Sequence, residues 1–111
     1  FTACGHRAET IDNKIAGNKD SEAIEKSITL AARSLGWTVQ PLDGQTMEAT
    51  IKSIDESLTV LITYTPQSYV IQYKDSINLD FDARDNSIKK QYIRWVEDLD
   101  ERIQQEMKRV K

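Results

Sequence analysis

Carboxylates are the residues of this chain whose type and spacing could do chemistry. Asp80, Asp82 and Asp85 stand close together in LDFDARDN, and oxygen ligands at alternating positions are what a calcium loop uses. This segment has no glycine for the turn, and its third carboxylate is out of step. We therefore interpret the three residues as partners for free backbone N–H groups before a helix, and we expect no metal and no cofactor.

Other carboxylates fall in segments with helical spacing, namely Glu22, Glu25, Glu97, Asp98, Asp100 and Glu101. They could be proposed as acid and base pairs, but on charged helix faces we expect them to be solvated. The single histidine, His6, has no expected partner, and the sequence holds no Cys/His cluster, glycine-rich phosphate loop or Gly-x-Ser-x-Gly motif. We expect that the protein is not an enzyme.

The single cysteine, Cys4, follows two small residues in FTACG. A bacterial lipobox has a Leu-like residue, two small residues and then a Cys that is acylated and becomes the first mature residue. Phe1, Thr2 and Ala3 fit the first three places, which would make residues 1–3 a signal-peptide remnant. We expect Cys4 to carry acyl chains such as palmitate and to anchor the protein in a membrane. The alternative is a free thiol in a tail.

Composition indicates one small domain behind this anchor. The chain has 111 residues, of which 39% are hydrophobic and 30% charged. Its 15 basic and 18 acidic side chains are mixed along the sequence, so we expect no nucleic-acid partner. Residues 5–19 show neither helical nor alternating spacing. We therefore predict a flexible tether within residues 1–19 and a single, monomeric domain at 20–111.

Four strands are expected after a first helix. Helical spacing over residues 20–36 places Asp20 at the N-cap and Gly36 at the stop. The period then changes to two in residues 37–42, 45–52, 57–65 and 68–74. Short connections, such as the turn at Asp43-Gly44, favour an antiparallel meander.

A long helix is expected at the end of the chain, over residues 87–110. Its apolar stripe consists of Ile88, Tyr92, Trp95, Val96, Leu99, Ile103, Met107 and Val110. We expect Trp95 to be buried against the sheet. The predicted fold class is α+β with two layers: an N-terminal helix, a four-stranded antiparallel meander and a long C-terminal helix, with both helices on one sheet face.

Two surfaces of this fold could bind a partner. On the outer sheet face, Leu61 and Val70 interrupt a Thr-rich series, and an edge strand could add a partner strand. Tyr64, Tyr73 and Tyr92 occupy core-facing positions, where packing is their ordinary role. They could also line a cleft between the last helix and the sheet. The first surface predicts a protein partner and the second a small ligand.

Three parts of the sequence together resemble those of a known family. They are the lipobox-like start, the segment ITYTPQSYVIQYKDSINLDFD and the helix motif Tyr-x-x-Trp-Val-x-x-Leu at Tyr92, Trp95, Val96 and Leu99. The chain resembles a family of small proteobacterial envelope lipoproteins of uncharacterised function. Lys89 and Ile93 stand where members often have His and Asn. The resemblance implies a lipoprotein facing the periplasm, and it implies no known reaction.

These observations lead to one expectation about role. We expect a membrane-anchored lipoprotein that acts as a non-catalytic binding or assembly module for another envelope protein. The alternative is a domain that binds a small ligand, such as a lipid or a peptidoglycan fragment. Gly5, rather than Asp, after the cysteine favours the outer membrane, with the domain facing the periplasm or exposed at the cell surface.

Overall fold

The computed structural model describes residues 7–15 and 20–109, which form two helices packed on one antiparallel sheet. The expected α+β class is confirmed. The sheet contains β1 (Ile11–Lys14), β2 (Thr38–Pro41), β3 (Thr46–Lys52), β4 (Ser57–Tyr64) and β5 (Ser68–Ile77), in the order β1-β5-β4-β3-β2. Strands β2 to β5 make the predicted meander, but the expected number of four strands is wrong because β1 adds a fifth.

Strand β1 comes from the segment that we predicted to be a flexible tether. It pairs antiparallel with β5, with Ile11 opposite Ile71 and Lys14 opposite Ser68. The backbone N–H of Ile15 also donates to the carbonyl of Gln67 over 2.7 Å. The boundary expected at residue 20 therefore does not separate residues 7–15 from the domain. A four-residue strand with a polar residue, Asn13, on its inner side carries too little alternation to be recognised alone.

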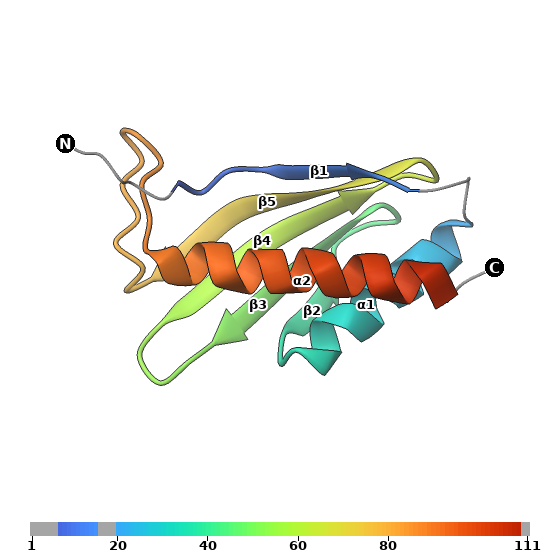
Figure 1. Cartoon of the computed structure of the whole chain (residues 1–111), viewed down its shortest axis with the longest axis horizontal. Helices are drawn as coiled ribbons and strands as arrows, with labels where there is room; N and C mark the ends of the chain where they lie inside the picture. Colours follow the sequence, from blue (N-terminus) through green and yellow to red (C-terminus); the bar gives the residue numbers. More distant parts are fainter. Residues whose placement is uncertain (1–6, 16–19, 110–111) are drawn as a thin grey trace.

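Both helices lie on the same face of the sheet (Figure 1), as expected. Helix α1 (Ser21–Ser34) ends before Gly36, whose φ of 93° lies in the left-handed region that glycine adopts without a Cβ clash. Helix α2 (Lys90–Arg109) runs along the long axis of the molecule beside α1. Neither of these two helices is long and apolar enough to cross a membrane, within the part of the chain that the structure describes.

The core lies between the inner sheet face and the two helices. Fully buried side chains from all of these elements include Ile24, Ile28, Met47, Leu58, Val60, Ile62, Tyr69, Ile71, Tyr92, Leu99 and Ile103. Trp95 packs against this cluster and is half-buried, so the expected burial of Trp95 is only partly met. The stripe Tyr92, Val96 and Leu99 points at the sheet, and Trp95 lies beside it on the helix surface.

A register shift changes which side chains face outward near the end of β5. Tyr73 pairs with Val60, but Asp75 pairs with Thr59, which leaves Lys74 as an extra residue at a bulge. Beyond this bulge Ile77 lies opposite Ser57 and is 61% exposed on the outer side.

Candidate functional site

A cluster of four polar side chains joins β1, β5 and α2. The Tyr69 hydroxyl donates to Oδ1 of Asp100 over 2.5 Å, and Nδ2 of Asn13 donates to the same oxygen over 2.7 Å. Nε2 of Gln104 donates to the other carboxylate oxygen over 3.2 Å, and Asn13 Nδ2 lies 3.4 Å from the Tyr69 hydroxyl. Asp100 therefore accepts three hydrogen bonds from three separate elements.

The sequence brings these groups together by simple periodicity. Asn13 and Tyr69 are opposite each other in the β1–β5 ladder, on the side that faces the helices. Asp100 follows Val96 by one helical turn and precedes Ile103 by another, so it lies at the edge of the buried stripe of α2. A partly buried carboxylate at this place is stabilised by donors, and charge-assisted bonds are stronger than neutral ones.

The environment keeps the Tyr69 proton on its oxygen. Burial is the main cause that raises the pKa of Tyr69 well above its usual range, and the hydrogen bond to Asp100 raises it further. A phenol with so high a pKa is a donor at neutral pH and is a poor acid. Its single proton is donated to Asp100.

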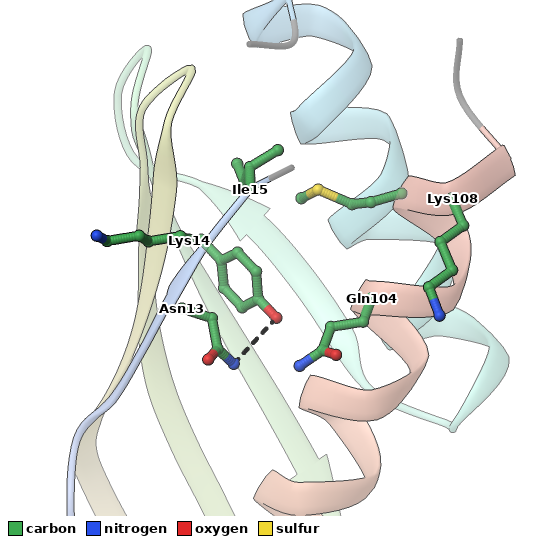
Figure 2. A pocket seen from close by; sticks show the side chains of 7 residues that line it. Asn13, Lys14, Ile15, Gln104 and Lys108 are labelled. Carbon is green, nitrogen blue, oxygen red and sulfur yellow. Dashed lines mark hydrogen bonds between the residues drawn. The ribbon is translucent and has the colours of Figure 1, made fainter. Parts of the chain in front are cut away.

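A pocket of about 250 Å³ opens beside the cluster, between β1 and the last turns of α2. Its wall is built from Asn13, Lys14, Ile15, Tyr69, Gln104, Met107 and Lys108. Figure 2 shows the amides of Asn13 and Gln104 pointing toward each other across the gap, and the Lys14 side chain directed away from α2. Ile15 and Met107 supply apolar surface, and Lys108 supplies a cation at the end of the helix. The pocket thus offers apolar contacts, amide groups and one positive charge.

Of the three tyrosines that we expected to share a cleft, Tyr73 and Tyr92 are in contact, whereas Tyr64 lies apart from them. The ring of Tyr73 stacks on Phe81 with centroids 4.2 Å apart and meets Tyr92 edge-on at 6.0 Å. The Tyr92 hydroxyl donates to the Glu9 carbonyl over 3.2 Å. Tyr64 lies opposite Tyr69, at the other end of β5 from Tyr73, and both Tyr64 and Tyr92 are buried. These tyrosines have packing roles, and none of them lines the pocket beside Asp100.

Leu61 and Val70 lie on the outer face of the sheet, as expected. They stand on neighbouring strands, with Leu61 opposite Gln72 and Val70 opposite Thr63, so they are diagonal neighbours. Both side chains are half-buried. None of the described helices covers this face.

The aspartates before α2 serve the loop. Arg84 hydrogen-bonds Asp82 through its guanidinium and its backbone N–H, and these bonds lower the pKa of Asp82 to about 2. Asp85 accepts from the Ser87 backbone N–H over 3.0 Å. Within residues 7–15 and 20–109, no group of three or more His, Cys, Asp or Glu side chains is arranged to hold a metal ion.

Sequence reasoning missed Asn13, Tyr69, Asp100 and Gln104 as a group, and Cys4 lies outside the described residues. The position of Asp100 one turn from both Val96 and Ile103 was the available signal. No protein-family model matches this chain, and a comparison with curated proteins finds no match.

Proposed function

We propose that this protein is a non-catalytic binding domain of the cell envelope, held at the outer membrane through acyl chains on Cys4, and that its ligand is a small molecule that enters the pocket between β1 and α2. The observation that carries the proposal is the pocket itself, where apolar side chains adjoin a set of hydrogen-bonding groups. The expected small-ligand alternative is thus favoured over the protein module, although with other residues than the three tyrosines.

The lining indicates what the ligand must present. An apolar group can pack on Ile15 and Met107, while the amides of Asn13 and Gln104 offer both donors and acceptors. Lys108 favours a carboxylate or another anion on the same molecule. Peptidoglycan fragments, with their acetamido methyl groups, amides and carboxylates, combine these features. A fatty acid would supply only the apolar chain and the anion.

The test is titration of the isotope-labelled protein with a muramyl dipeptide and, separately, with a medium-chain fatty acid, followed by NMR of side-chain amides. We expect the dipeptide to shift the amide signals of Asn13 and Gln104. Gln104→Leu should weaken binding by about tenfold or more, whereas Gln105→Leu on an exposed face should not. Absence of any shift with both compounds would remove the pocket from consideration, and a shift with the fatty acid alone would make the ligand a lipid.

A second candidate is a protein partner on the outer sheet face. Its support is the diagonal pair Leu61 and Val70, which places two adjacent apolar side chains on the outer sheet face. Another envelope protein would bury this pair. Photo-crosslinking from either position in intact envelopes should then capture a protein, and a photoreactive residue at Thr38 on the edge strand tests strand addition. If none of the three positions captures a protein, the pocket is the remaining candidate for the binding site.

Anchoring has its own test. Precursor expressed in a Gram-negative host should be cleaved before Cys4 and should gain the mass of three acyl chains. Cys4→Ser should release the domain from membranes. An unmodified thiol in membrane-extracted protein would contradict the anchor without bearing on the pocket.

A further inference from the structure

The end of the domain where α2 begins presents two isoleucines to solvent. Ile54 is 102% exposed in the turn between β3 and β4, and Ile77 is 61% exposed where β5 ends. Ile77 lies opposite Ser57, which is the first residue of β4 and follows that turn directly. The two side chains are therefore both exposed at the same end of the sheet.

Polar contacts fix the turn that carries Ile54. Nδ2 of Asn78 donates to the carbonyl oxygen of Asp55 over 2.5 Å. Nζ of Lys89 lies 3.3 Å from a carboxylate oxygen of Glu56. Asn78 itself has a φ of 61°, in the left-handed region that Asn tolerates better than most residues. The turn is thus tied to the loop between β5 and α2, and Ile54 is presented from a defined position.

The chain that leads to Cys4 leaves the domain at this same end. The backbone N–H of Ala8 donates to the carbonyl of Asn86 over 2.8 Å, and Arg7 makes a β-bridge with Ser87. Figure 1 shows the first described residues beside the loop that precedes α2. Cys4 stands three positions before Arg7, and three residues of extended chain span at most about 11 Å. An anchor on Cys4 would therefore hold this end close to the lipid.

We propose that the end of the domain formed by Ile54, Ile77 and the loop before α2 rests on the lipid bilayer. Aliphatic side chains at a fixed turn can enter the boundary between headgroups and acyl chains. Exposed basic residues at this end of the domain, Lys52 and Lys90, can meet phosphate groups. Asp55 and other acidic residues also lie at this end, so the surface carries charges of both signs. In this proposal the covalent anchor attaches the domain to the bilayer, and the isoleucines set the orientation of the domain on it.

This inference uses the proposed position of the anchor but is independent of any pocket ligand. The test couples the Cys4 thiol to a maleimide phospholipid in vesicles of phosphatidylethanolamine and phosphatidylglycerol, so acylation in cells is not needed. A tryptophan is introduced by Ile54→Trp, and the matched control is Leu42→Trp. Leu42 is 50% exposed in the turn at the opposite end of β3. Brominated acyl chains then quench any tryptophan that enters the bilayer.

We expect the quenching added by Ile54→Trp, measured over the parent protein, to exceed that added by Leu42→Trp at least twofold. Both positions are exposed turns, and an unchanged unfolding curve confirms that each variant is folded. Equal or weaker quenching for Ile54→Trp would overturn the proposal. Protection of that tryptophan from a water-soluble quencher without bromolipid quenching would also overturn it, because a second copy of the chain would then cover this end.

Discussion

The hydroxyl of Tyr69 lies 2.5 Å from Oδ1 of Asp100, which joins the inner side of β5 to the C-terminal helix through a charge-assisted hydrogen bond. Asn13 completes the link by bonding the same oxygen from β1. The cluster therefore couples three elements that are far apart in sequence. Three of its members, Asn13, Tyr69 and Gln104, also line the pocket.

Removal of the Tyr69 hydroxyl should destabilise the domain more than removal of a neutral hydroxyl. Tyr69→Phe leaves Asp100 with two donors instead of three, and loss of a bond to a charged group costs about 1.5 to 3 kcal/mol. Tyr73→Phe is the control, since that hydroxyl bonds only the Ser76 hydroxyl, over 2.8 Å, and should cost about 1 kcal/mol. Urea unfolding measures both, and equal costs would contradict the special position of Tyr69.

Stability should fall at alkaline pH because of the tyrosines. Burial raises the pKa of all four above the usual value, that of Tyr92 to about 12. The unfolded chain loses its phenol protons near pH 10, about two units below Tyr92 in the folded state. The unfolded state then binds fewer protons, so the tyrosines should leave the free energy of unfolding unchanged below about pH 9 and should decrease it at higher pH. Tyrosinate absorbance at about pH 10 should therefore increase when the protein is unfolded.

Two leucines test where the core ends. Leu99 on α2 is 0% exposed, so Leu99→Ala should cost about 2 to 5 kcal/mol through lost burial and a cavity. Leu30 on α1 is 48% exposed, and Leu30→Ala should cost less than about 1 kcal/mol. The same substitution at two helical sites removes differences in helix propensity. Similar costs at both sites would show that the packing of α2 on the sheet is wrong.

Hydrogen exchange should distinguish a paired β1 from a tether. The amides of Ala8 and Ile15 donate to backbone carbonyls of Asn86 and Gln67. We expect both to exchange more slowly than the same residues in an unfolded chain, by at least about tenfold. Exchange at unfolded-chain rates would place residues 7–15 outside the fold.

The elements with strong periodicity could be predicted from the sequence. Helix α2 and strands β3 to β5 bury one side each, and their apolar spacing identifies them. The bulge at Lys74 could not be predicted from the sequence. Apolar residues stand at alternate positions again in Ile77, Leu79 and Phe81, so the spacing gives no sign of an extra residue. Only strand pairing reveals that Ile77 faces outward.

The polar cluster could not be predicted for a different reason. Asp100 stands among other acidic residues on α2. The charged composition of this part of the helix indicates a solvated face. Its half-buried state depends on Asn13, which is 87 residues away in the sequence and comes from a strand too short to recognise. Tyr69 lies in the alternating segment 68–74, but the partner of its hydroxyl comes from a tertiary contact with α2.

The position of β1 also determines how the domain would respond to mechanical load. A load applied to β1 from its N-terminal side acts along the long axis of the molecule, because β1 runs parallel to that axis (Figure 1). The ladder bonds between β1 and β5 lie perpendicular to the strands, so a pull along that axis loads all of them together in shear. The bonds of Asn13 to Asp100 and of Tyr92 to Glu9 resist the same displacement from the helix side. Traction between the membrane and whatever the domain binds would therefore be borne by an edge strand clamped from two directions.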